Sequence, residues 1–383
     1  MSGVVPDRVP YLPKIWVDLA CKITGTPYIS VINDPFAILE VLAKAYIQTG
    51  ADGIRQFHFP VRNLVEKDGK VFETGVNREI VGEVDLHGGL ITHLENPDHF
   101  NYEDPYFMAY NHYWCSSKPL IPNLQAAKKM AVPLKSYYEE TGCGDRQQII
   151  LEKYGDQAAI LGDCDTATMS FLVTMRGMEQ ALTDIILDPG LVHGIMEKGV
   201  AYCIEKAKFN IDRGIKILRL NDSVGNMNVI SPEHWEEFVF PHFKTICEEL
   251  HHYDPEVRIY CHICGNTIPV MEKLVETGLD CIGPLDPLGG VDPLQAREMV
   301  GNRVALLGGV DTLSFLNKNV EDISCEAVYC MNTAGKHGGY VLSSGCVLPR
   351  DSRIDNIHAL AELVRKHGRY RDGHLINNST PRC

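Results

Sequence analysis

The chain has 383 residues, of which 45% are hydrophobic and 22% are charged, and its formal net charge is −14. This composition predicts an ordered globular protein with one large core or two modest ones. The negative charge disfavours nucleic acid and anionic membrane surfaces as partners, because binding to either needs a positive field. No apolar run is long enough for a membrane span, and residues 1–10 lack the layout of a secretory signal. With 13 cysteines that show no disulfide framework, we expect a cytoplasmic protein with reduced thiols.

The first elements alternate between strand and helix. An apolar stretch over residues 13–20 predicts a short strand, and residues 34–50 predict a helix. Asp34 is placed to be the N-cap of this helix, and Pro35 occupies its first turn. Residues 54–59 then read as a second strand. This order is typical of the start of an α/β domain.

The pattern changes over residues 63–94, where short segments alternate between apolar and polar residues. An Asp-Gly pair at 68–69 predicts the turn of a β-hairpin. We therefore expect a β-rich subdomain here, outside the main repeat. An aromatic linker over 99–113 follows, and then a helical pattern over 123–138 that a turn at 142–145 is expected to end.

One unit recurs in the remaining chain: an apolar strand, a loop with polar residues or glycine, and an amphipathic helix. The expected strands cover residues 158–164, 216–222, 257–262, 279–286, 304–311 and 340–344. With the earlier strands, they predict a parallel sheet covered by helices. An open doubly wound sheet is the alternative, but no G-x-G-x-x-G motif follows a strand.

We therefore predict an α/β fold, a TIM (β/α)8 barrel with an additional β-rich amino-terminal subdomain. In this division, residues 1–120 form the amino-terminal segment with the hairpins and the first barrel elements. Residues 121–383 form the main part of the barrel and carry the candidate site. In such barrels, function lies on the loops that follow the strands.

The strand over 257–262 ends in a pattern that suits a metal site. Because side chains alternate along a strand, His262 and Cys264 should point the same way. An imidazole and a thiolate make half of a zinc site. Cys346, in a Gly-Cys turn after the last strand, is the best candidate for a third ligand, which leaves a fourth position open. The alternative is that all three are buried groups of an ordinary core.

Aspartates also lie where predicted strands end: Asp163, Asp222, Asp286 and Asp311. A carboxylate at this place is either a catalytic group or a cap of the following turn or helix. Asp311, before Thr312, suits capping. Asp222 does not start a helix directly, so it is the stronger candidate for a functional carboxylate.

Several motifs together resemble the uroporphyrinogen decarboxylase superfamily. They are Asn-Asp-Ser-Val-Gly at 221–225, Cys-His-Ile-Cys-Gly-Asn at 261–266, Leu-Gly-Gly-Val-Asp at 307–311 and Ser-Ser-Gly-Cys-Val-Leu-Pro at 343–349. The resemblance covers residues 150–370 best. The pairing of His-x-Cys with Ser-Gly-Cys is similar to the zinc-dependent, corrinoid-linked methyltransferase branch. It implies a TIM barrel in which His262, Cys264 and Cys346 bind Zn²⁺. The arginine-rich amino-terminal motif of the decarboxylases is absent from residues 13–20.

This resemblance implies methyl transfer with a corrinoid (cobalamin) protein as partner. One kind of member methylates a thiol such as coenzyme M, and the other passes the methyl group of a substrate, typically an aryl methyl ether, to a cob(I)amide. The extended amino-terminal region and the tyrosines at 106, 110 and 113 favour the aryl ether. Asp222 or Asp311 would then position a proton or a substrate hydroxyl. The thiol methyltransferase and a uroporphyrinogen decarboxylase-like decarboxylase are the alternatives.

Overall fold

A curled parallel sheet forms the centre of the protein. The computed structural model describes residues 5–31, 34–55, 63–74, 80–85, 90–93, 101–105, 108, 119–140 and 143–376. Every neighbouring pair of strands in this seven-stranded sheet is parallel. In spatial order the strands are β1 (Gly53–Arg55), β6 (Ala159–Thr166), β7 (Ile217–Asn221), β8 (Arg258–His262), β9 (Cys281–Leu285), β10 (Ala305–Val310) and β11 (Tyr340–Ser344). All seven carboxyl ends therefore meet at one rim.

The amino-terminal segment 9–14 closes this sheet into a barrel. On one side, the Leu12 amide donates to the carbonyl of Leu342 in β11 at 2.9 Å. On the other side, the Asp52 amide, just before β1, donates to the Tyr11 carbonyl at 2.9 Å. Segment 9–14 thus occupies the place of an eighth strand. The predicted TIM-type barrel is confirmed.

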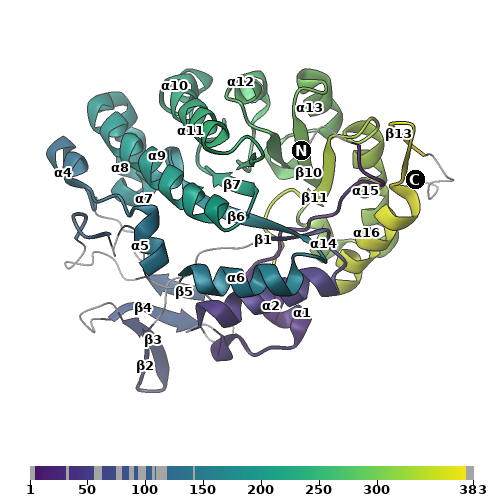
Figure 1. Ribbon diagram of the computed structural model, residues 1–383, viewed down its shortest axis with the longest axis horizontal. Coiled ribbons are helices and arrows are strands. Elements are labelled where there is room, and N and C mark those ends of the chain that lie inside the picture. Colours follow the sequence, from purple (N-terminus) through teal and green to yellow (C-terminus); the bar gives the residue numbers. More distant parts are fainter. Residues whose placement is uncertain are drawn as a thin grey trace.

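Helices surround the barrel and bury its outer face (Figure 1). The main ones are α2 (Pro35–Gln48), α6 (Cys143–Tyr154), α9 (Pro189–Asp212), α11 (Phe240–Tyr253), α13 (Pro293–Val300), α15 (Val320–Thr333) and α16 (Ile354–His367). The shorter ones are α1 (Val17–Thr24), α4 (Leu124–Lys129), α5 (Lys135–Glu140), α7 (Met169–Arg176), α8 (Met178–Leu187), α10 (Pro232–Phe238), α12 (Met271–Glu276) and α14 (Ser314–Asn317). None of these described helices is long and apolar enough to cross a membrane.

The predicted β-rich subdomain is a four-stranded antiparallel sheet outside the barrel, at the lower left of Figure 1. Its strands are β2 (Asn63–Lys67), β3 (Lys70–Thr74), β4 (Ile80–Asp85) and β5 (Leu90–His93). Asp68 and Gly69 turn the first hairpin with φ values of 52° and 72°. Two successive positive φ angles are what a tight hairpin turn requires, so the predicted hairpin is confirmed. Tyr106, Tyr110 and Tyr113 lie outside the described residues.

One predicted element near the amino terminus of the barrel was wrong. Residues 13–20 do not form a strand, because helix α1 begins at Val17 and the strand-like segment lies earlier. Pro10 and Pro13 lack amide donors, which limits this segment to a single ladder bridge at Tyr11.

A turn was expected at 142–145, but residues 143–145 form the start of α6 (Cys143–Tyr154), and residue 142 lies outside the described residues. Gly144 misled the prediction, since it lies in the first helical turn, where a Cβ would fall 2.0 Å from the guanidinium of Arg213. Gly144 lets the Arg213 side chain approach the helix closely, and it does not break the helix.

Candidate metal centre

The structure brings the three predicted ligands together. The ligand atoms of His262, Cys264 and Cys346 all lie within 4.8 Å of one another, and this is the metal-like cluster found among the described residues. His262 is the last residue of β8, and Cys346 follows β11 by two positions. The carboxyl ends of parallel strands share one rim, and this brings Cys346 close to Cys264, which lies 82 positions earlier in the chain.

The loop after β8 is held so that Cys264 turns back toward the rim. Gly265 has a φ of +91°, and a Cβ at this position would lie 2.7 Å from the Asn226 side chain. Its amide donates to the Asp286 carboxylate at 2.9 Å. Glycine is required by both the backbone conformation and the close contact. Asp286 therefore positions the ligand loop.

The loop that carries Cys346 is fixed in the same manner. The Gly345 amide donates to the Val310 carbonyl at 2.7 Å, and the Ser344 hydroxyl donates to the Cys346 carbonyl at 2.6 Å. These bonds tie the turn after β11 to the end of β10. The thiol of Cys346 thus faces Cys264 from a rigid support.

The two candidate thiols differ from the other free cysteines. Nine described cysteines are free, and all are buried except Cys264 and Cys346, which are half-buried. Cys325 is disulfide-bonded, so the expectation that all thiols are reduced was wrong. A hydrogen bond from the Cys264 thiol lowers the pKa of Cys346, and the same bond raises the pKa of Cys264. The pair therefore already favours one thiolate, which is the form that binds metal.

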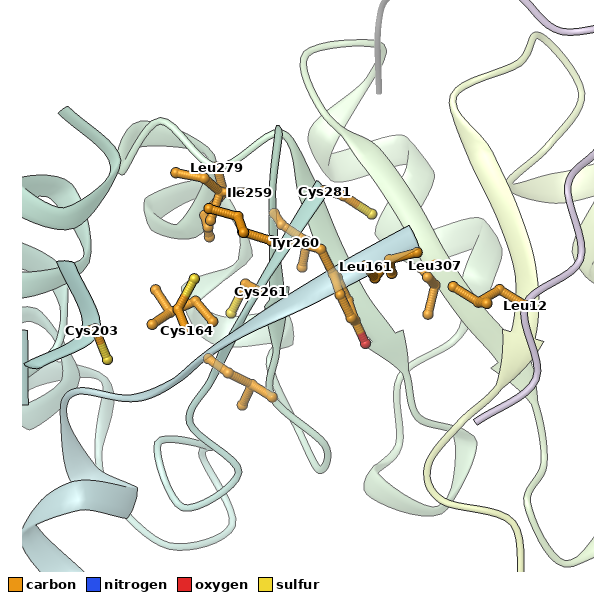
Figure 2. Packing of buried hydrophobic residues seen from close by; sticks show 14 of the residues in the cluster. Leu12, Leu161, Cys164, Cys203, Ile259, Tyr260, Cys261, Leu279, Cys281 and Leu307 are labelled. Carbon is orange, nitrogen blue, oxygen red and sulfur yellow. The ribbon is translucent and has the colours of Figure 1, made fainter. Parts of the chain in front are cut away.

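His262 is a buried ring held by two neighbours. Its Nδ1 lies 2.7 Å from the Tyr260 hydroxyl, and its Nε2 contacts the Nζ of Lys14, whose pKa burial lowers well below the ordinary lysine value. Burial, with the nearby positive charge of Lys14, lowers the pKa of His262 and keeps the ring neutral. Figure 2 shows Tyr260 and Cys261 leaving β8 on opposite sides, with the tyrosine ring directed toward the barrel interior. A neutral imidazole oriented through Nδ1 presents Nε2 as a metal ligand.

Charged groups line the barrel interior close to His262. Arg219 on β7 makes a two-point contact with Asp163 on β6, at 2.8 and 3.1 Å. Arg55 at the end of β1 is only 3% exposed. Burial and the charge of Arg219 lower the pKa of Arg55. Both arginines, like Lys14, help to lower the pKa of His262.

Asp222 is fully buried and its carboxylate is already occupied. It accepts hydrogen bonds from the Thr168 hydroxyl and from the amides of Met169, at 3.3 Å, and Ser170, at 2.6 Å. It thus caps the start of α7, which follows β6, although Asp222 itself comes directly after β7. Burial raises its pKa. Its catalytic role stays a prediction, and its contacts are those of a cap.

Asp311 lies apart from the three ligands. Its carboxylate accepts from the Leu313 amide at 2.7 Å, as expected of a local cap. With Asp292, Glu326 and Tyr329 it lines a cleft between α13 and α15, and none of the three candidate ligands lines this cleft. A catalytic role for Asp311 also stays a prediction.

Sequence reasoning missed Lys14 and Tyr260, whose side chains lie within hydrogen-bond distance of the His262 ring. Tyr260 is two positions before His262 on the same strand, so strand alternation alone places it on the same side. Lys14 is 248 positions from His262, and no local pattern connects them. Its one signal is a cation within an otherwise apolar amino-terminal segment.

The donor set fits zinc. One imidazole and two thiolates are ligands that Zn²⁺ prefers, and three protein ligands with a free position are typical of a catalytic site. The hydrogen bond at His262 Nδ1 is the usual support of a metal-bound histidine. Other transition metals also bind thiolate ligands, but a tetrahedral site with nitrogen and sulfur ligands favours zinc.

The fold and this site define a barrel protein with a candidate metal centre at the carboxyl rim, and comparison with known proteins gives the family. The model of the uroporphyrinogen decarboxylase (URO-D) family matches residues 119–367, so the chain belongs to this family. The resemblance drawn from the sequence is thereby confirmed.

Known relatives include both methyltransferases and decarboxylases. The chain is 22% identical over 202 residues to a methylated-thiol–coenzyme M methyltransferase of Methanosarcina mazei. These aligned residues make up 52% of each chain. It is 28% identical over 178 residues to a uroporphyrinogen decarboxylase of Coxiella burnetii, covering 46% of this chain and 48% of the other. The chain thus spans about half the length of these relatives.

A solved structure shares the fold over most of the chain. A methyltransferase from Methanosarcina mazei superimposes with a TM-score of 0.70, covering 95% of this chain and 96% of the other at 16% identity. At this identity the likeness is one of fold. It extends to the amino-terminal part that the family model leaves unmatched.

Proposed function

We propose that the protein is a zinc-dependent methyltransferase that moves a methyl group from an aryl methyl ether to the cob(I)amide of a corrinoid protein. The convergence of His262, Cys264 and Cys346 within 4.8 Å carries this proposal. A decarboxylation site would have no need for such a donor set. The methyltransferases among the relatives support transfer of a methyl group.

The residues of the chain have separate tasks in this reaction. His262 and the thiolates of Cys264 and Cys346 would hold the zinc, and three protein ligands would leave one position for a substrate. Tyr260 fixes the imidazole, since the neutral ring that binds through Nε2 carries its proton on Nδ1 and donates it to the phenol oxygen. Bound zinc supplies a Lewis acid for the ether oxygen, whose charge grows as the methyl group leaves. The rim must stay open for a corrinoid to reach the methyl carbon.

Methylation of a thiol is the second candidate. The relative from Methanosarcina mazei is named for methylated thiols and coenzyme M. A zinc-bound thiolate is also a chemically reasonable methyl acceptor, because zinc takes thiols as thiolates. Both candidates use the same three ligands and a corrinoid, and they differ in the direction of transfer.

The test begins with metal content and methyl transfer by the purified protein. We would compare the wild type with His262→Ala, Cys264→Ala and Cys346→Ala. Cys261→Ala is the matched control, because it removes a thiol from the same strand on the opposite side. Cob(I)alamin with methoxylated aromatics tests demethylation, and methylcobalamin with thiols tests the second candidate. Visible absorbance follows the corrinoid in both assays.

We expect about one zinc per chain in the wild type and in Cys261→Ala, and its loss together with methyl transfer in the three ligand variants. Transfer only from methylcobalamin to thiols would replace the first candidate by the second. Zinc-free wild-type protein that still decarboxylates uroporphyrinogen would refute both, and would assign the chain to the decarboxylases of its family.

A further inference from the structure

A cleft lies between helix α1 and the loop that connects β11 to α16, and the proposed reaction does not use it. Its volume is about 460 Å³, and none of the three candidate metal ligands lines it. Cavities of this size hold small organic molecules. Charged side chains from both walls and apolar residues from the turn after α1 line the cleft. It is therefore a candidate for a second binding site.

The walls of this cleft are joined by hydrogen bonds. Lys22 Nζ, on α1, donates to the Arg350 carbonyl at 3.3 Å and lies 3.8 Å from the Asp351 carboxylate. Where α1 ends, the Thr26 amide donates to the Cys21 carbonyl at 2.9 Å. These contacts link α1 to a loop more than 300 positions away in the chain. The cleft therefore results from the packing of distant segments.

Two of the four charged groups in the cleft neutralise each other. Lys22 and Asp351 form the ion pair described above. Asp18 and Arg350 also line the cleft, and neither forms an ion pair with any residue that the structure describes. Burial raises the pKa of Asp18, and the positive charge of Arg350 counteracts part of this rise. The cleft thus offers one carboxylate and one guanidinium without ionic partners.

Apolar surface makes up much of the remaining wall. Pro27 and Ile29 line the cleft, and Ile29 is 46% exposed. The Cys21 thiol lines it too, and burial raises the pKa of this thiol to about 11. Cys21 is therefore a neutral, weakly polar group at neutral pH. A ligand with an apolar part can cover Ile29 while its charged groups meet Asp18 and Arg350.

We propose that this cleft binds a small zwitterion, namely an α-amino acid with an apolar side chain. Asp18 binds the ammonium group, and the guanidinium of Arg350 binds the carboxylate, for which its planar fork is suited. The apolar side chain packs on Pro27 and Ile29. A simple anion or a simple cation would leave one of the two charges of the cleft without a partner. The inference goes beyond the proposed function and does not depend on it.

The test measures binding by calorimetry. L-leucine, L-methionine and L-phenylalanine are titrated into the wild-type protein, together with two analogues of leucine. Leucinamide lacks the carboxylate, and 4-methylpentanoate lacks the ammonium. We expect leucine to bind about 10-fold more tightly than either analogue, because each analogue loses one charged hydrogen bond.

An amino acid can also chelate a metal ion, so the metal centre needs a control. The same titrations are made with Cys264→Ala, which lacks one of the candidate zinc ligands. Binding at the cleft should persist in this variant, because Cys264 does not line the cleft. Loss of binding in Cys264→Ala would place the ligand at the metal centre and overturn the proposal.

Variants assign the binding to the two charges. Asp18→Asn and Arg350→Gln should each weaken leucine binding about 10-fold. Arg350→Glu replaces the cation by a second carboxylate, so leucinamide should then bind more tightly than leucine. Arg350 is exposed, so its variants test the proposal even if Asp18→Asn does not fold. Asp156→Asn and Arg371→Gln are the controls, since they remove exposed charges outside the cleft and should leave binding unchanged.

Three further results would overturn the proposal. The first is the absence of binding by all three amino acids at about 10 mM. The second is equal binding of leucine and its two analogues to the wild type. The third is undiminished leucine binding in Arg350→Gln and Arg350→Glu. None of these results depends on methyl transfer, so the amino-acid site and the proposed function are tested separately.

Discussion

Tyr260→Phe removes one atom from the support of the candidate metal centre. The lost hydroxyl lies 2.7 Å from His262 Nδ1, and Tyr260 is 2% exposed, so little room exists for water to replace it. We expect zinc affinity to fall about 10- to 100-fold, which is about 1.4–2.8 kcal/mol, because the ring loses its orienting partner. The free energy of unfolding of the metal-free protein should fall by about 1 kcal/mol, the net value of one hydrogen bond.

The assay is competition for zinc with a chromophoric chelator at neutral pH, together with urea unfolding of the metal-free protein. Tyr11→Phe is the matched control, because it also removes a buried hydroxyl, one that donates to the Ile357 carbonyl at 3.1 Å. This control should lose similar stability and keep its zinc affinity. If both variants bind zinc as tightly as the wild type, Tyr260 has no part in orienting His262, and the reasoning is refuted.

Three further outcomes are expected. Gly265→Ala places a Cβ 2.7 Å from the Asn226 side chain, at a residue whose φ is +91°. We expect the free energy of unfolding in urea to fall by about 1–3 kcal/mol and the zinc content to decrease. Unchanged values of both would contradict the strain argument. Asp163→Asn removes the carboxylate that meets Arg219 at 2.8 Å, and should lower the free energy of unfolding by about 3 kcal/mol in the same assay. In the zinc-free protein, the lowered pKa of Cys346 preserves its thiolate to lower pH than an ordinary thiol. Alkylation of Cys346, followed by mass spectrometry, should therefore continue at pH values where an ordinary thiol no longer reacts. In Cys264→Ala, the same alkylation should require a higher pH. An identical pH profile in the two proteins would contradict the role of the Cys264 hydrogen bond.

Local patterns in the sequence were enough for most of the barrel. The strands β6 to β11 lie within two residues of their predicted ranges, because buried parallel strands read as short apolar runs between turns. The cap of α2 was predicted for a similar reason, since Asp34 bonds amides two and three residues ahead. His262 and Cys264 are two positions apart, so alternation along a strand fixes their common side.

The environment of the site was decided by contacts between distant parts of the chain. Asp222 caps α7 from 53 residues away, so its local sequence gives no sign of a helix start. Lys14 meets His262 across 248 positions, because the barrel closes between segment 9–14 and β11. The sequence by itself determined the repeating strands and helices and the three candidate metal ligands. Only the closed barrel decided which cations and hydroxyls surround those ligands, because barrel closure sets distances that no sequence period encodes.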